Sequence, residues 1–328
     1  MSHASGAGDE IPERFLSCAI PVLPVRRDVR AWGLGPMIVR CVADGVEVLA
    51  PAKLNLFLEV LGSRPDGYHE IETLMVAVGL HDTLRFADDP SGRITLRCDD
   101  PSLPTGPENL VVKAAERLKV ESGCPRGAVI DLHKSIPAQA GLAGGSSDAA
   151  ATLAALDRLW NLQTHPDRLD ALAGEIDSDV AFFRHAPAAI CRGRGERASA
   201  VPLPVAYHFV LVCPPLGLKT ADVYRHLTLT DRTRPIDAVV AALASGDSAA
   251  LGACLFNRLQ PAAEQLNPEL VRVREALANL GPSLDGHLIC GSGSAYFGLG
   301  RNLDAARRAA RALEKLGLGR VRVVTCGP

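Results

Sequence analysis

A glycine- and serine-rich stretch placed directly before an alanine-rich segment constrains the fold of this chain more than any other feature. Residues 136–148 read Ile-Pro-Ala-Gln-Ala-Gly-Leu-Ala-Gly-Gly-Ser-Ser-Asp. Leu153, Leu156 and Trp160 follow at the spacing of one helix face. The sequence therefore predicts a loop that leads into the first turn of a helix, which ends near Asn161.

This junction is suited to binding phosphate. Glycines allow a ligand close to the backbone, and the unpaired N–H groups of a helix start carry about half a unit of positive charge. The alternative is a capped helix after a flexible turn, which needs only one Ser or Asp and one Gly. Three glycines and two serines favour phosphate. No Gly-Lys-Ser/Thr follows them, so the motif is not that of the P-loop NTPases.

Length and composition exclude several classes of function. A chain of 328 residues with a net charge of −2 forms one large or two medium domains and has no positive field for nucleic acid or anionic membrane. Its nine cysteines are scattered without a Cys-x-x-Cys pair, which favours reduced thiols over disulfides or structural zinc. The apolar patch 15–23 follows acidic residues and contains Pro21, so we do not expect a signal sequence. We expect a cytoplasmic protein.

The pattern of strands and helices divides the chain into two predicted domains. Residues 1–44 show no clear period and form an extension that is either disordered or packed on the body. The first domain, 45–203, is expected to carry strands at 46–50, 54–60, 71–78, 82–86, 93–98, 128–133 and 187–192, with helices at 109–121 and from 166 onward. In the second, 204–328, we expect an antiparallel sheet of strands at 207–213, 288–290, 295–299 and 321–325, with helices at 236–244, 248–259, 269–280 and 303–316.

Two side chains of an early strand are candidates for a functional site. Lys53 and Asn55 lie two residues apart, so they share one face of the strand. A lysine in an apolar strand is unfavourable unless a negative group meets it. The alternative is an edge-strand lysine whose ammonium group reaches water.

Two further segments carry candidate chemistry. Tyr68 and His69 follow a predicted turn at 63–67, and their rings are suited to stacking on a heterocyclic base and hydrogen bonding to it. Alone, such a pair is also common on surfaces. Asp179 lies in the segment Ile-Asp-Ser-Asp-Val-Ala-Phe-Phe of residues 176–183. On residue type alone, Asp179 is best interpreted as a helix N-cap.

Taken together, these segments resemble the GHMP kinase superfamily. Residues 137–148 are similar to its phosphate loop Pro-x-x-x-Gly-Leu-Gly-Gly-Gly-Ser-Ser-Asp, with Ala143 in place of a glycine. Lys-x-Asn followed by Asp-Gly-Tyr-His-Glu resembles one family within it, the 4-diphosphocytidyl-2-C-methyl-D-erythritol kinases, over about residues 48–300. Residues 189–196, 218–224 and 289–298 match further family segments. The departures from the family pattern are Ala143, Met75 for a frequent aromatic residue, Asp177 for a glycine and Ala181 for a proline.

The resemblance implies a fold and a reaction. The fold is the α+β GHMP kinase fold, with an N-terminal domain like ribosomal protein S5 domain 2 and a ferredoxin-like C-terminal domain. The reaction is the ATP-dependent phosphorylation of the 2-hydroxyl of 4-diphosphocytidyl-2-C-methyl-D-erythritol, in the non-mevalonate (methylerythritol phosphate) pathway of isoprenoid biosynthesis. Mg²⁺ is expected with ATP, since phosphoryl transfer generally uses it.

The resemblance also assigns residues. It implies that Asp179 accepts or orients the substrate hydroxyl with Lys53 as its partner, while Asp177, two residues away, is expected to point elsewhere. Residues expected to bind ATP are Pro137, Ala138, Gln139, Ala140, Gly141, Leu142, Ala143, Gly144, Gly145, Ser146 and Ser147, the last also as a metal contact. Residues expected to bind substrate are Asn55, Tyr68, His69 and Met75.

Two alternatives stay open at this point. Another GHMP kinase, acting on homoserine, mevalonate or a sugar, has no base for Tyr68 and His69 to contact. A non-catalytic ligand-binding member is favoured by the departures from the family pattern, but it has no use for both Lys53 and Asp179. For partners we expect the small-molecule substrate alone, without nucleic acid or membrane, and for assembly a monomer or weak homodimer.

Overall fold

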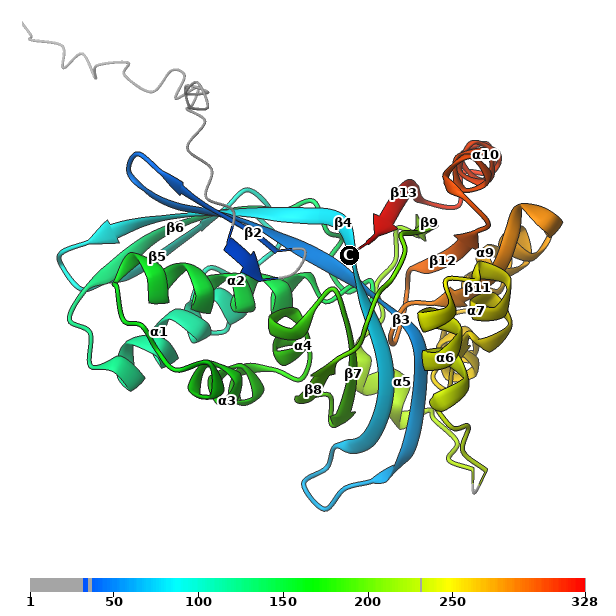
Figure 1. The fold of residues 1–328 in the computed structure, drawn as a ribbon, viewed down its shortest axis with the longest axis horizontal. Coiled ribbons are helices and arrows are strands. Elements are labelled where there is room, and N and C mark those ends of the chain that lie inside the picture. The colour runs from blue at the N-terminus through cyan, green and yellow to red at the C-terminus, as the bar shows by residue number, and fades with distance from the viewer. Residues whose placement is uncertain (1–31, 35–36, 231, 328) are drawn as a thin grey trace, which may run out of the picture.

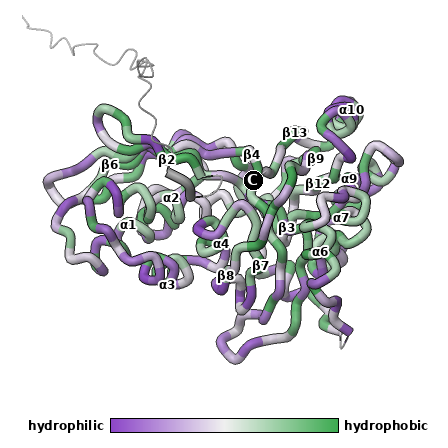
Figure 2. Tube along the Cα trace, viewed as in Figure 1, coloured by the Kyte–Doolittle hydropathy of each residue, from purple (hydrophilic) through white to green (hydrophobic). Residues whose placement is uncertain are grey.

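Two β-sheets, each covered by helices, form the body of the chain in this computed structural model (Figure 1). The structure describes residues 32–34, 37–230 and 232–327. Hydrophobic residues follow the central strands, and hydrophilic residues gather at the outer loops (Figure 2). Within the described residues, none of the helices combines the length and the apolarity that crossing a membrane requires.

Within the described residues, the first sheet has nine strands, and it supports one face of the site. Its main path runs β1 (Trp32–Leu34), β2 (Met37–Val42), β3 (Gly45–Ser63), β4 (His69–Asp89), β6 (Gly127–His133) and β5 (Ile94–Cys98). Three strands branch from it: β7 (Ala188–Gly193) pairs with β4, β8 (Arg197–Ala200) pairs with β7, and β10 (Phe256–Asn257) pairs with β3.

Four helices lie together on this sheet (Figure 1). They are α1 (Leu110–Ser122), α2 (Gly144–Leu159), α3 (Pro166–Ile176) and α4 (Val180–His185). Helix α1 connects the parallel strands β5 and β6, and the predicted cap Asn109 accepts a hydrogen bond from the backbone N–H of Val111. Helix α2 begins in the glycine-rich loop, as the sequence predicts, and it packs on β3 and β4.

Strands β3 and β4 are longer than the sequence suggests. Each was expected as two short strands, but each runs without a break, and the two pair antiparallel along most of their length. The pairing shifts register between Pro51 and Ala52, opposite the segment from Val78 to His81. A bulge of this kind accommodates a proline that cannot donate to the ladder, so Pro51 bends the strand and does not end it.

The N-terminal extension was expected to cover residues 1–44, but the last part of this range belongs to the first sheet. Residues 1–31, 35 and 36 lie outside the described residues, but β2 pairs with β3 from Ile38 to Val42. Met37 and Val39 are 3% and 4% exposed, because alternate residues of the strand point into the core. That two-residue alternation was the signal for a strand that belongs to the body.

The second sheet is antiparallel, in the order β11 (Leu284–Ile289), β12 (Tyr296–Gly300), β9 (Tyr207–Cys213) and β13 (Arg320–Cys326). Of these four strands, β9 comes first in the sequence, and in the sheet it lies between β12 and β13, the third and fourth. This is the ferredoxin-like order. Helices α9 (Glu269–Ala278) and α10 (Leu303–Glu314) pack on it, and a short 3-10 helix, η1 (Gly281–Ser283), precedes β11. The predicted α+β architecture is confirmed. The domain boundary near residue 203 falls between β8 and β9 and stays a prediction.

One helix of this half was predicted wrongly. The segment 248–259 forms α7 (Ser248–Cys254), then strand β10, and α8 (Gln260–Leu266) follows. Leu255 is extended, and Phe256 and Asn257 pair in parallel with β3. Tertiary pairing therefore overrides helix propensity here. The remaining helices are α5 (Thr220–Arg225) and α6 (Asp237–Ser245).

Candidate active site

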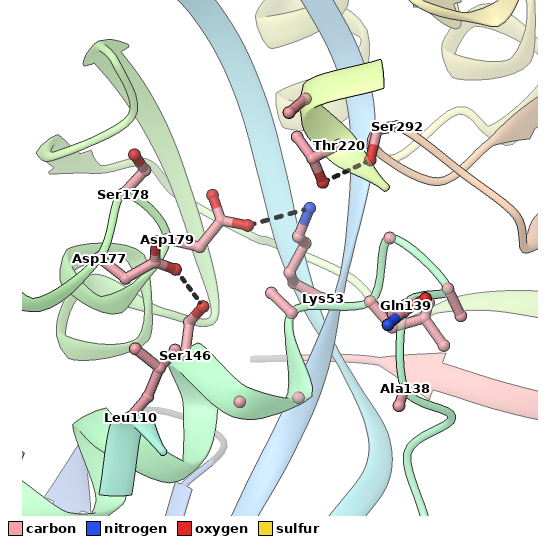
Figure 3. A pocket seen from close by; sticks show the side chains of 18 of the residues that line it. Lys53, Leu110, Ala138, Gln139, Ser146, Asp177, Ser178, Asp179, Thr220 and Ser292 are labelled. Atoms are coloured by element: carbon pink, nitrogen blue, oxygen red, sulfur yellow. Dashed lines mark hydrogen bonds and ion pairs between the residues drawn. The ribbon is translucent and has the colours of Figure 1, made fainter. Parts of the chain in front are cut away.

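A cavity of about 900 Å³ lies between the two halves of the molecule. The glycine-rich loop before α2 forms one wall, and strand β3, the connection from α3 to α4 and helix α5 form the others. Every residue from 137 to 146 lines it. Figure 3 shows side chains from these separate segments pointing toward one another. The stretch that the sequence singled out is therefore a wall of the cavity.

Contacts from both halves hold the glycine-rich loop. The carbonyl of Leu142 accepts a hydrogen bond from the Lys53 N–H at 3.1 Å, and the carbonyl of Ala140 accepts one from the Ala295 N–H at 3.1 Å. Gly141 has φ +77°, and a Cβ there would lie 1.9 Å from the carbonyl oxygen of Cys290. Only glycine fits at such a position, so the loop is fixed in one shape.

The start of α2 is open to an anion. Ala143, at the N-cap position, has φ 54° and ψ 36°, and no side chain caps the helix. The N–H groups of the first turn therefore lack a side-chain acceptor, and the helix dipole adds positive charge there. This arrangement favours the phosphate-binding interpretation over the capping alternative, since a cap would have occupied these donors.

The two adjacent serines have different surroundings. Ser146 lines the cavity, and its hydroxyl donates a hydrogen bond to Asp177 Oδ2 at 2.7 Å (Figure 3). Ser147 is fully buried, does not line the cavity, and its hydroxyl has no partner among the described residues. Successive helix residues point about 100° apart. The structure thus corrects the expectation that Ser147 contacts the metal, because Ser146 is the hydroxyl that reaches the cavity.

Lys53 is buried but compensated. It is 3% exposed, and its Nζ donates to Asn55 Oδ1 at 2.6 Å and lies 3.3 Å from Asp179 Oδ2 (Figure 3). Asn55 in turn donates to Thr73 Oγ1 at 2.9 Å, and Thr73 donates to the Phe57 carbonyl at 2.6 Å. This chain of bonds fixes the ammonium group in the cavity and rules out the edge-strand alternative for Lys53.

Asp179 occupies the N-cap position of α4, as its residue type suggested, yet its side chain makes no capping hydrogen bond. The carboxylate turns to Lys53 and remains 26% exposed toward the cavity. Lys53 and Asp179 come from distant parts of the sequence, and the fold brings them together. A carboxylate held beside an ammonium group can receive or orient a hydroxyl proton of a ligand.

Asp177 was expected to point away and does not. It ends α3, lines the same cavity as Asp179, and accepts the hydrogen bond from Ser146. Burial raises the pKa of Asp177, and the charge of Asp179 adds to the rise, while the bond from Ser146 opposes it. Sequence alternation could not place Asp177, because residues 177–179 form a turn between two helices and not a strand.

Part of the cavity wall is aromatic. The ring of His69 stacks on that of Tyr224 with centroids 4.8 Å apart and an interplanar angle of 29°. The guanidinium of Arg194 lies over the ring of Tyr68 at 5.1 Å. All four residues line the cavity, and Tyr68 is 50% exposed. Sequence matching had singled out the segment that contains Tyr224 but had not assigned the ring.

Met75 is not part of this aromatic wall. It is fully buried in the hydrophobic core and does not line the cavity, so its expected role in substrate binding is corrected. Its neighbour across the sheet is Ala189 of β7. Both residues belong to the same hydrophobic core.

A second glycine turn lies beside Lys53. The side chain of Asn257 donates to the carbonyls of Ile289 and Gly291 at 3.1 and 2.7 Å, and it thereby holds the turn from strand β10. The hydroxyls of Ser292 and Thr220 lie 3.0 Å apart (Figure 3). Asn257 was hidden from sequence analysis because its segment was expected to be helical.

A buried charge cluster supports the other side of the loop. The Lys134 Nζ contacts Asp82 and lies 2.8 Å from Asp148 Oδ2, and all three side chains are at most 9% exposed. Asp82 also accepts the N–H groups of Ser135 and Ile136, at 2.6 and 2.9 Å. Burial raises the pKa of Asp148 to about 7, with Lys134 opposing the rise and Asp82 adding to it. Burial disfavours the Lys134 charge, but the two carboxyls outweigh it and raise the Lys134 pKa.

Comparison with known proteins agrees with this geometry. The model of the GHMP kinases N terminal domain matches residues 109–187, and that of the GHMP kinases C terminal domain matches residues 239–317. A 4-diphosphocytidyl-2-C-methyl-D-erythritol kinase of Pelotomaculum thermopropionicum is 44% identical over 268 residues, covering 81% of this chain and 92% of that relative. The enzyme of the same name from Bacillus mycoides is 40% identical, covering 77% and 87%.

Solved structures agree as well. A crystal structure of 4-(cytidine 5'-diphospho)-2C-methyl-D-erythritol kinase superposes with a TM-score of 0.72 at 40% identity, covering 86% of this chain and 99% of that one. The homoserine kinase from Cytophaga hutchinsonii superposes with a TM-score of 0.69 at 21% identity, covering 88% and 96%, and shares the fold alone. This chain belongs to the 4-diphosphocytidyl-2-C-methyl-D-erythritol kinase family of the GHMP kinases.

Proposed function

We propose that the chain transfers the γ-phosphoryl group of ATP to the 2-hydroxyl of 4-diphosphocytidyl-2-C-methyl-D-erythritol, a step of the non-mevalonate pathway of isoprenoid biosynthesis. The observation that carries the proposal is a single cavity that joins an anion-binding helix start, the Lys53–Asp179 pair and a stacked aromatic pair. Phosphoryl transfer needs phosphate donors, a cation near the reacting oxygen and an acceptor for the hydroxyl proton.

Each part of the cavity has a role in this proposal. The loop 137–146 and the first turn of α2 bind the ATP phosphates through backbone N–H groups. The substrate hydroxyl oxygen attacks the γ-phosphorus, the bond to the ADP oxygen breaks, and the hydroxyl proton passes to Asp179. Lys53 stabilises the negative charge on the transferring oxygens and keeps Asp179 directed at the hydroxyl.

The aromatic part of the cavity wall accepts the cytosine. Tyr68, His69 and Tyr224 offer ring faces and hydrogen-bonding groups to a base, which homoserine, mevalonate and simple sugars lack. Homoserine and mevalonate kinases resemble the chain at 21% and 15% identity, and this likeness supports the fold only. The non-catalytic alternative is disfavoured, because a pure binding protein has no need of a buried lysine held against a carboxylate.

Mg²⁺ is proposed to enter with ATP, and the donor atoms of the cavity fit it. Where the cavity meets the glycine-rich loop, its walls offer hydroxyl and carboxylate oxygens, the ligands that Mg²⁺ prefers. No group of three or more His, Cys, Asp or Glu side chains placed to hold a metal was found in the part of the chain that is described. Bound with ATP, the ion would neutralise the charge of the phosphates, and phosphate and water oxygens would complete its coordination.

The test is ATP consumption measured with and without the diphosphocytidyl substrate. We expect ATP consumption to depend on that substrate and to be inhibited by cytidine nucleotides. Homoserine and mevalonate should not stimulate it. Asp179→Asn should lower turnover by about 10²-fold or more while retaining nucleotide binding. Unchanged turnover in this variant removes Asp179 from the role, and indifference to cytidine nucleotides favours another GHMP substrate.

Assembly belongs to the proposal too. We propose a monomer or a weak homodimer, in which the residues of one chain line the cavity. Sedimentation over a range of protein concentrations tests this assignment. A dimer that persists at the lowest concentration contradicts it.

A further inference from the structure

The Asp177 carboxylate is the feature of the cavity that the proposed reaction has not used. It comes from the connection between α3 and α4 and lies within hydrogen-bond distance of Ser146 on the first turn of α2 (Figure 3). Its location calls for a physical reason.

A second carboxylate at this position creates a problem of charge. Asp177 and Asp179 both line the cavity, and a bound triphosphate would add several negative charges beside them. Lys53 pairs with Asp179, and the charge of Arg194 favours the ionised form of Asp177 only in part, because burial still raises the Asp177 pKa. Among the described residues, no ion pair joins Asp177 to a basic side chain. A cation that arrives with the nucleotide would supply the missing compensation.

The donor atoms around Asp177 match this requirement. Ser146 provides a hydroxyl from the first turn of the helix that follows the phosphate loop, and Asp177 provides a carboxylate whose Oδ2 lies 2.7 Å from that hydroxyl. P-loop NTPases hold Mg²⁺ with the same two kinds of group, a Ser or Thr at the end of the phosphate loop and an Asp from another segment. The hydrogen bond keeps both oxygens together before the nucleotide binds.

We infer that Asp177 and Ser146 together anchor the divalent cation of the bound nucleotide. The inference rests on the proposed function, since it concerns the cation that accompanies ATP. It assigns Asp177 a role different from that of Asp179, which faces Lys53 and the substrate hydroxyl. In this assignment Asp177 contacts the cation, and Asp179 contacts Lys53 and the substrate hydroxyl.

The experiment measures binding and not turnover. Affinity for a non-hydrolysable ATP analogue is determined by calorimetry, once with MgCl₂ and once with EDTA, and binding of free Mn²⁺ in the presence of the analogue is followed by electron paramagnetic resonance. The variants are Asp177→Asn, Asp177→Gly and Ser146→Ala. Asp167→Asn is the matched control, because Asp167 lies on the same helix α3, exposed and outside the cavity.

We expect Asp177→Asn and Asp177→Gly to weaken binding of the analogue at least 10-fold in Mg²⁺ and to leave it unchanged or tighter in EDTA, because only the cation needs the carboxylate. Mn²⁺ binding should weaken in parallel, Ser146→Ala should lose several-fold, and the Asp167→Asn control should match the wild type. Melting temperatures measured without nucleotide should stay within a few degrees of one another, which shows that the variants are folded.

Two results overturn the inference. Equal loss in Mg²⁺ and in EDTA means that Asp177 only shapes the loop, and equal affinities of Asp177→Asn and wild type in Mg²⁺ mean that the carboxylate does not hold the metal. In both cases the wild type still binds the analogue, and the proposed kinase function stands. If the wild type binds the analogue in neither condition, the proposed function fails and this inference fails with it.

Discussion

Gly291 lies directly against Lys53, since a Cβ at Gly291 would stand 3.2 Å from the Lys53 Nζ and 3.4 Å from Asn55 Oδ1. The residue also has φ +51°, a conformation that favours glycine. Gly291→Ala should therefore displace the lysine and lower kcat at least 10-fold, because small misplacements of catalytic groups are costly. It should also cost about 1 kcal/mol of stability through backbone strain.

The matched control for this prediction is Gly62→Ala. Gly62 lies on β3, the strand that carries Lys53. It has no positive φ, and a Cβ there would meet nothing within 4 Å. Steady-state kinetics and urea unfolding of both variants form the measurement. Full kcat in Gly291→Ala, alongside full kcat in the control, would show that the turn does not position Lys53.

Ala143→Gly should stabilise the protein. Ala143 has left-handed backbone angles at the start of α2, and these angles strain a residue that carries a Cβ. The strain energy that glycine removes exceeds the free-energy cost of the extra freedom that glycine has in the unfolded chain. We therefore expect the free energy of unfolding to rise by about 0.5–1 kcal/mol. Ala138→Gly, in the same loop but without a positive φ, should lose stability instead. Urea unfolding gives both values, and a loss in Ala143→Gly contradicts the strain argument.

The Asp148 carboxyl should make stability depend on pH. Its pKa is raised to about 7 by burial, so between roughly pH 4 and pH 7 the folded protein holds a proton that the unfolded chain has released. Stability from this group therefore falls as the pH rises through that window. Asp148→Asn lacks the titration, and the free energy of unfolding should shift in favour of the variant by about 2–3 kcal/mol between pH 5 and pH 8.

Asp82→Asn provides the contrast within the same cluster. Asp82 accepts two backbone N–H groups in addition to its contact with Lys134, so its loss should destabilise the protein at every pH. Unfolding by urea at four pH values distinguishes the two variants. A constant difference between wild type and Asp148→Asn across the series would show that Asp148 does not titrate there.

Tyr224→Leu should weaken binding of the diphosphocytidyl substrate. The ring stacks on His69 in the aromatic part of the cavity wall, and aromatic stacking on a base contributes about 1–3 kcal/mol. We expect KM for that substrate to rise about 10-fold or more while KM for ATP stays near the wild-type value. Tyr224→Phe keeps the ring and should keep the affinity. Parallel changes in both KM values would argue that Tyr224 acts on the whole cavity and not on the base.

The elements that the sequence predicted best are those decided by local chemistry. The glycines and serines before α2, the Asn109 cap of α1 and the nearly continuous apolar run of β9 are each specified by neighbours in the chain. The pairing of Lys53 with Asp179 came from matching separated segments to a known family. The local sequence around either residue would not have predicted the pair, because many residues separate the two.

The misses have a common physical origin in contacts made across the fold. Ser146 and Ser147 are identical residues, and only the exact start of α2 decides which one faces the cavity. Asn257 lies in a segment with helical character that pairs with β3 instead. Met75 packs in the hydrophobic core, away from the cavity, and its partner Ala189 comes from a distant strand. None of these partners is visible from the neighbouring sequence.

Strand β3 passes through the hydrophobic cores of both halves. Val46 and Val48 lie in the core beside α2, Leu58 and Val60 lie in the core beside β9 and α9, and Lys53 stands between them. Because one unbroken backbone crosses both cores, neither half can swing as a rigid body without tearing its hydrogen-bonded ladder. We therefore expect ligand entry and product departure to depend on loops at the rim of the cavity, with Lys53 held in place on the strand that both cores share.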